Sequence, residues 1–160
     1  MAIFFETVDG DVWIAKPHLS FGGKEVRTFQ NSLESRAVVE IETNQVPLPS
    51  QQVELFKELL LAPVNEPDGK LLEGLPDVFG KIIVRDQFSL ESFSVGYLKQ
   101  HLAVRISGLW NTPDLATITY FLLDYSNSTL IKVAYKAPSE QYRLYETAAS
   151  DLIFSLRFDD

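Results

Sequence analysis

The fold of this chain is decided by residues 117–135, which are TITYFLLDYSNSTLIKVAY. Two runs rich in Thr, Ile, Val, Tyr and Phe, 117–125 and 130–135, flank the polar segment 126–128. β-branched and aromatic residues favour strands, and a short polar turn between two such runs is typical of a β-hairpin. The segment therefore predicts an antiparallel hairpin as the best-defined part of a sheet.

Shorter runs elsewhere predict further strands. Residues 36–43 are typical, because Val39 and Ile41 alternate with Glu40 and Glu42, which gives a strand one apolar and one polar face. The other strands expected from such patterns lie at 25–29, 79–84, 93–98 and 102–106.

A second hairpin is predicted at the start of the chain. The dipeptide Asp9-Gly10 separates the apolar runs 5–8 and 12–14. Asp-Gly between two such runs is a strong local signal for a two-residue hairpin turn. We therefore expect the fold to open with a hairpin.

Two amphipathic helices are predicted, each after a proline. Ser50 follows Pro49 and Ser139 follows Pro138, so each serine is expected as the N-cap of a helix. Pro63 is expected to end the first helix, before a long loop at 63–76. The apolar positions are Val53, Phe56 and Leu60 in the first helix, and Tyr142, Tyr145, Ala149, Leu152 and Leu156 in the second.

The order of these elements indicates the fold class. Strands, a helix, antiparallel strands and a final helix follow one another without the regular alternation that makes a parallel sheet. We therefore expect an α+β fold, in which helices pack on an antiparallel sheet as an α/β/α sandwich. At 160 residues the chain is expected to form one domain, 1–160.

Composition excludes several classes of protein. Hydrophobic residues make up 46% of the chain and aromatic residues 12%, too many for intrinsic disorder. Without cysteine there is no disulfide, thiolate zinc site or cysteine nucleophile. No apolar run reaches the length of a membrane span, and the start of the chain shows no signal peptide, so we expect a cytoplasmic protein.

The charge balance bears on partners. The chain has 22 acidic and 14 basic residues, giving a net charge of −8. Its densest basic stretch is only Lys132 with Lys136, so nucleic-acid binding is not expected. An acidic surface favours a basic protein partner, although the same charge also keeps ordinary proteins soluble.

Catalytic patterns are sparse. The two histidines, His18 and His101, lack metal-ligand spacing, and no Gly-x-Ser-x-Gly elbow occurs. Asp9 and Asp11 are explained by the predicted turn, and Lys24 after Gly22-Gly23 lacks the remainder of a phosphate-binding loop. We therefore predict no metal and no cofactor.

Three residues are the candidates for a binding surface. Glu40 and Glu42 are expected about 7 Å apart on one strand face, where a solvated outer face is the simpler interpretation. Trp110 precedes Asn111-Thr112-Pro113, and a Trp beside such a turn can be an exposed anchor, with core packing as the alternative.

The end of the chain resembles a known family. The segment 142–158, a Tyr-x-x-Tyr-Glu helix followed by LIFSLRF, is similar to the C-terminal helix and last short strand of PsbP-like domains. The resemblance covers about a third of the chain and implies an α/β/α sandwich. Residues 39–43, followed by 49–52 and a helix, are also similar to small bacterial domains, some of them found beside toxin genes.

These observations favour a non-catalytic protein-interaction or accessory domain. Its concrete form is a bacterial toxin-immunity protein, whose acidic surface covers a basic groove. The alternative is a small-ligand binder or hydrolase that uses His18 or His101 with a carboxylate. A subunit that assembles mainly with itself is the third hypothesis.

Overall fold

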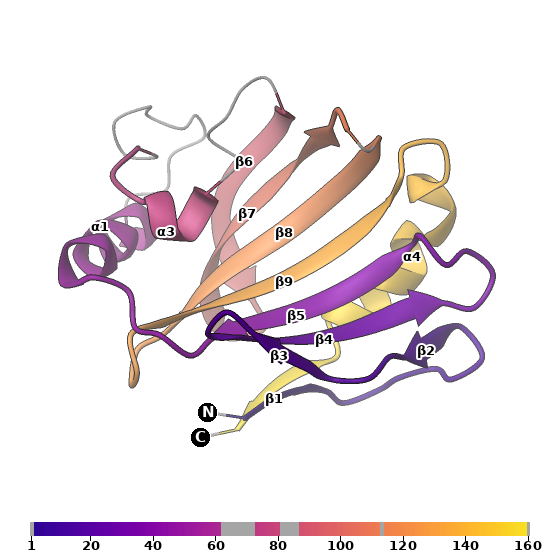
Figure 1. Ribbon diagram of the computed structural model, residues 1–160, viewed down its shortest axis with the longest axis horizontal. Helices are drawn as coiled ribbons and strands as arrows, with labels where there is room; N and C mark the ends of the chain where they lie inside the picture. The colour runs from indigo at the N-terminus through magenta and orange to yellow at the C-terminus, as the bar shows by residue number, and fades with distance from the viewer. Residues whose placement is uncertain (1, 62–72, 81–86, 113, 160) are drawn as a thin grey trace.

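The computed structural model describes residues 2–61, 73–80, 87–112 and 114–159. These residues form an α+β fold, in which three helices pack against a large antiparallel sheet of eight strands (Figure 1). The sheet strands are β2 (Trp13–Ala15), β3 (Leu19–Phe21), β4 (Lys24–Asn31), β5 (Val38–Asn44), β6 (Phe88–Leu98), β7 (His101–Trp110), β8 (Leu115–Asp124) and β9 (Thr129–Pro138).

The strand order is β2-β4-β5-β9-β8-β7-β6, and β3 also pairs with β4. Two further strands, β1 (Ala2–Phe5) and β10 (Leu156–Asp159), form a separate antiparallel pair that brings the two ends of the chain together (Figure 1). The helices are α1 (Ser50–Leu61), α3 (Pro76–Phe79) and α4 (Tyr142–Ile153).

The hairpin of β8 and β9 confirms the central prediction. Its register runs without interruption from Leu115 opposite Pro138 to Asp124 opposite Thr129. The Asp124 carboxylate closes the turn, because it accepts hydrogen bonds from the amide of Ser126 and from the side chain of Asn127, both at 3.0 Å. The strands predicted at 25–29, 93–98 and 102–106 lie within β4, β6 and β7, and the one predicted at 36–43 overlaps β5, which begins two residues later at Val38.

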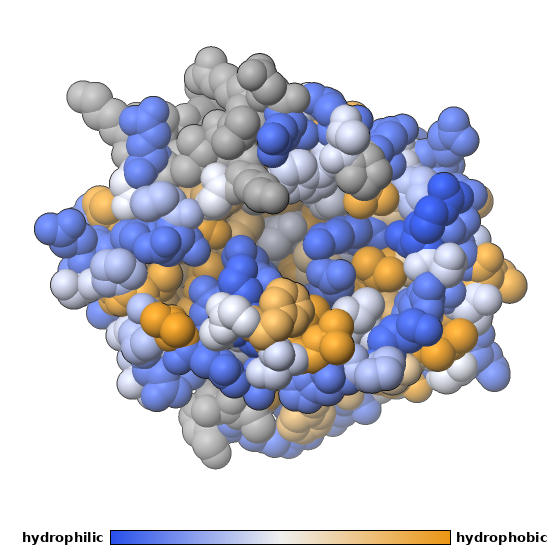
Figure 2. Space-filling model, in the orientation of Figure 1, coloured by the Kyte–Doolittle hydropathy of each residue, from blue (hydrophilic) through white to orange (hydrophobic). Residues whose placement is uncertain are grey.

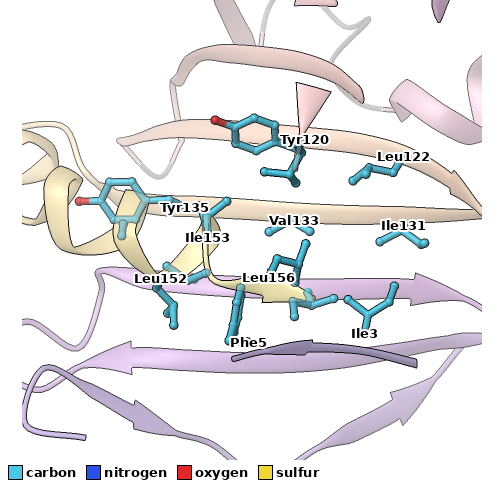
Figure 3. Packing of buried hydrophobic residues seen from close by; sticks show 14 of the residues in the cluster. Ile3, Phe5, Tyr120, Leu122, Ile131, Val133, Tyr135, Leu152, Ile153 and Leu156 are labelled. Atoms are coloured by element: carbon cyan, nitrogen blue, oxygen red, sulfur yellow. The ribbon is translucent and has the colours of Figure 1, made fainter. Parts of the chain in front are cut away.

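Each face of the sheet carries its own hydrophobic core. Figure 1 shows α1 and α3 on the near side of the sheet and α4 behind it. Figure 3 shows the core on the α4 side, where the β1–β10 pair also packs. Its central residues are Ile3, Phe5, Tyr120, Leu122, Ile131, Val133, Tyr135, Leu152, Ile153 and Leu156. The core on the other face joins α1 and α3 to one half of the sheet, and there Phe79 of α3 lies edge-on to Phe121 at 5.2 Å between ring centroids.

The predicted N-terminal hairpin is wrong, although its turn exists. The amides of Val12 and Trp13 donate to the carbonyl of Asp9 at 3.1 and 2.9 Å, so the chain does reverse there. However, β1 pairs with β10 and β2 pairs with β4, so the strands on either side of the turn belong to different sheets. The local sequence specifies the turn, whereas the pairing partners lie far along the chain.

Both predicted N-caps are wrong by a short distance. Ser50 is the first residue of α1, and the amides of Gln52 and Val53 donate instead to the carbonyl of Pro49. Gln141 precedes α4, while the Ser139 hydroxyl donates to Asp114 on the turn before β8.

Other predicted boundaries also change. Leu156, expected on the last helix, begins β10. Phe79, expected to start a strand at 79–84, ends the short helix α3, and residues 81–84 of that strand lie outside the described residues. Pro63 and most of the loop 63–76 also lie outside them, whereas Pro76 begins α3. Within the described residues, no helix has the length and apolar character needed to cross a bilayer.

A close approach between β6 and β7 makes Gly108 sensitive to substitution. A Cβ at this position would overlap the carbonyl oxygen of Ser89 and the ring of Phe88. We predict that Gly108→Ala lowers the free energy of unfolding by about 1–3 kcal/mol, measured by urea denaturation. Gly96→Ala on β6 is the control, because its Cβ would meet no atom within 4 Å, and a change below about 0.5 kcal/mol is expected. Equal effects of the two substitutions would contradict the close approach.

Candidate binding groove

A groove of about 560 Å³ crosses the face of the sheet that carries α1 and α3. Figure 2 shows this face hollowed near its middle. The groove extends from β4 across β5, β9 and β8 to the end of β7, and α3 borders it. The described residues that line it are Lys24, Glu40, Glu42, Phe79, Gly80, Gln87, Trp110, Thr112, Leu115, Thr117, Thr119, Phe121, Lys132, Ala134 and Lys136.

Strand alternation determines which side chains reach the groove. Glu40 and Glu42 of β5 lie opposite Ala134 and Lys132 of β9. Because side chains opposite each other in a sheet share a face, the polar side chains of neighbouring strands meet in one place. Val39, which precedes Glu40, and Ile41, which lies between the two glutamates, face the α4 core instead.

Ion pairs join the charged residues of the groove floor. The Glu42 carboxylate lies between two lysines, 3.5 Å from Lys24 Nζ and 3.4 Å from Lys132 Nζ. Glu40 pairs with Lys136 at 3.0 Å. Both glutamate side chains are about three-quarters buried, with 21% and 27% of their surface exposed. These pairs are therefore partly removed from water rather than fully solvated.

Lys132 is the most enclosed of the three lysines. Its ammonium lies 5.9 Å from the centre of the Phe121 ring, in addition to its pairing with Glu42. Burial lowers the pKa of Lys132, because a charged group loses hydration there, while Glu42 acts in the opposite direction. Glu42 is therefore the neighbouring group that favours the charged form of Lys132.

Trp110 forms the opposite end of the groove. Its indole packs on Phe88, with 4.9 Å between ring centroids, and the side chain remains partly exposed. Leu115, opposite Trp110 in the sheet, and Thr112 line the same end. An aromatic and apolar end thus faces a charged floor.

The structure brings the three sequence-predicted binding residues, Glu40, Glu42 and Trp110, into this one groove. It changes the interpretation of the glutamates, because both are paired with lysines and neither belongs to a freely solvated acidic face. Sequence reasoning did not identify Lys132 and Lys136 as site residues. The missing information is which strands pair, because the opposite charges on β5 and β9 meet only when these two strands are neighbours.

The groove has the opposite sign of charge to the rest of the protein. Among the described residues that line it, three lysines and two glutamates give +1. Because the whole chain carries −8, all other residues together carry −9. An approaching partner therefore meets a positive floor within an acidic protein.

The other candidate residues lie away from the groove. His18 is exposed and 3.9 Å from Glu25, and the ring of His101 packs on Phe158. Neither histidine is among the described residues that line the groove. Asp9 accepts a hydrogen bond from the amide of Asp11 within the turn. In the part of the chain that the structure describes, no group of three or more potential ligand residues could hold a metal ion.

Comparison of the sequence with protein-family models and with curated proteins returned no match.

We predict that the two members of the Glu42–Lys132 pair differ in their effect on stability. Glu42→Gln leaves two lysines without a carboxylate, one of them well buried, and should lower the free energy of unfolding by about 1–2 kcal/mol. Lys132→Met keeps the contact with Phe121 and leaves Glu42 paired with Lys24, so a change below about 0.5 kcal/mol is expected. Urea denaturation at pH 7 measures both, and a larger loss for Lys132→Met would contradict this description of the floor.

Proposed function

We propose that the protein is a non-catalytic binding domain, and that the groove receives a segment of another protein. The observation that carries this proposal is the charged floor beside Trp110. Partly buried ion pairs and an accessible Trp in a concave surface are features of protein-binding sites, because such groups contribute specificity and anchoring.

The dimensions favour a helical segment of the partner. The groove crosses five strands, from β4 to β7, which corresponds to about 19 Å. An α-helix of about 13 residues has this length. The small side chains of Thr117, Thr119 and Ala134 in the floor let a helix approach closely, next to the position that α3 occupies.

The charges indicate how the partner is attracted. The acidic remainder of the surface favours a basic partner at long range, whereas the groove itself favours a segment that carries a carboxylate. Neutralisation of a basic bacterial toxin is one form of this function, in which the toxin presents its own helix to the groove.

We also propose that the fold is an α/β/α sandwich of the PsbP-like type. The order of hairpin, helix and short strand in β8, β9, α4 and β10 supports this assignment. Helices on both faces of the sheet also support it.

The test is affinity capture from a lysate of the source cells, followed by binding measurements with the recovered protein. Trp110→Ala should weaken binding about 30-fold, as expected for an anchor that contributes about 2 kcal/mol. Lys136→Glu, which reverses a charge at a partly exposed position, should also weaken binding. This second variant tests the groove even where Trp110→Ala impairs folding. Tyr125→Ala is the matched control, because Tyr125 is an exposed aromatic residue outside the groove.

Two results would contradict the proposal. One is recovery of the same partner, with the same affinity, by the wild type and both groove variants. The other is a capture in which no protein is retained specifically at low salt.

A further inference from the structure

A second cavity, of about 280 Å³, lies beside α4 on the other face of the sheet. Ile118 and Tyr120 of β8 line it, whereas Thr117 and Thr119 of the same strand line the floor of the groove. Because side chains alternate along a strand, the sheet itself separates the two sites. This cavity is therefore independent of the proposed function.

Four tyrosines line this cavity: Tyr97, Tyr120, Tyr135 and Tyr142. Figure 3 shows the hydroxyls of Tyr120 and Tyr135 pointing to the same side. The Tyr135 hydroxyl donates to the carbonyl of Tyr142 at 2.7 Å. Burial raises the pKa of Tyr142 to about 12, so its phenol stays neutral at physiological pH. The tyrosines thus give the cavity an aromatic and uncharged part of its wall.

Two opposite charges accompany these rings. Arg105 lies on β7, between Ser94 of β6 and Tyr120 of β8, and Glu146 lies on α4. Among the described residues, no carboxylate lies within 4.0 Å of the Arg105 guanidinium, and no cationic group lies within that distance of Glu146. The three lysines of the groove, by contrast, are all paired.

We propose that this cavity binds a free α-amino acid with an apolar side chain. Arg105 holds the α-carboxylate, Glu146 accepts hydrogen bonds from the α-ammonium group, and the tyrosine rings contact the side chain. A guanidinium matches the two oxygens of a carboxylate, and aromatic rings provide apolar contact area.

The charges of the site select a free amino acid over a peptide. An internal peptide residue has neither an α-carboxylate nor an α-ammonium group, and each chain terminus has only one of them. The volume is just below the range of about 300–1,000 Å³ for drug-sized ligands, which suits a single amino acid.

The experiment is a titration of ¹⁵N-labelled protein, followed by NMR, with three probes. L-Phenylalanine carries both charges, phenethylamine lacks the carboxylate and 3-phenylpropionate lacks the ammonium group. We expect phenylalanine to shift resonances of β7, β8 and α4, and to bind at least tenfold more tightly than either analogue, because each loses a charge-assisted contact.

Variants assign the two charges. Arg105→Gln should weaken phenylalanine binding at least tenfold, to about the affinity of the wild type for phenethylamine. Glu146→Gln should weaken phenylalanine binding to about the affinity of the wild type for 3-phenylpropionate. Arg143→Gln is the control, because Arg143 is an arginine of α4 that does not line this cavity. The affinity of this variant for phenylalanine should stay within about twofold of the wild-type value.

The proposal is overturned if phenylalanine causes no saturable shifts up to about 10 mM, which places any dissociation constant beyond that range. It is also overturned if the three probes bind equally, or if Arg105→Gln and Arg143→Gln have the same effect. The three substituted side chains are exposed, so we expect all variants to fold. Unchanged resonances in the remainder of the spectrum verify this.

Discussion

Alternation along β5, β9 and β8 is the constraint on which the rest of the structure depends. On one face these strands present mainly apolar residues and tyrosines, and α4 with the β1–β10 pair packs on them. On the other face the side chains change from apolar to polar along the strands. Phe121, Leu123 and Leu130 lie under α1 and α3, whereas Glu40, Lys132 and their polar neighbours continue the same face beyond those helices. The helices cover the apolar half, and the groove is the half that they leave open.

The charges explain why no apolar element of the described chain fills that half. Covering the ion pairs of Glu40 and Glu42 with a hydrophobic helix would remove the remaining hydration of five charged groups, and the attraction within each pair offsets such a loss only partly. A partner that brings its own polar groups can replace this hydration. The arrangement therefore keeps a concave, charged surface open on one face of the sheet, while α4 and the β1–β10 pair pack on the other face.

The local sequence predicted those features that depend on neighbouring residues. The β8–β9 hairpin combines strong strand formers with a polar turn, and both long helices follow the apolar periodicity. Pairing over long distances was beyond such reasoning, which is why β1 was joined to β2 instead of β10. The convergence of Glu40 and Trp110 could not be predicted either, because β9 and β8 lie between their strands. Alternating Glu in one strand and Lys in another suggests such a pair, but only tertiary structure specifies it.

Selective quenching of Trp110 fluorescence tests the central claim most directly, namely that the open groove is positive within an acidic protein. Trp13 is buried, with 3% of its surface exposed, so Trp13→Phe leaves Trp110 as the only reporter. Iodide and caesium carry opposite charges, and a local positive field concentrates the anion. The account predicts that iodide quenches Trp110 more efficiently than caesium at low salt, and that high salt reduces the difference. Stronger quenching by caesium, as the net charge of −8 alone would give, or no quenching by either ion, would contradict it.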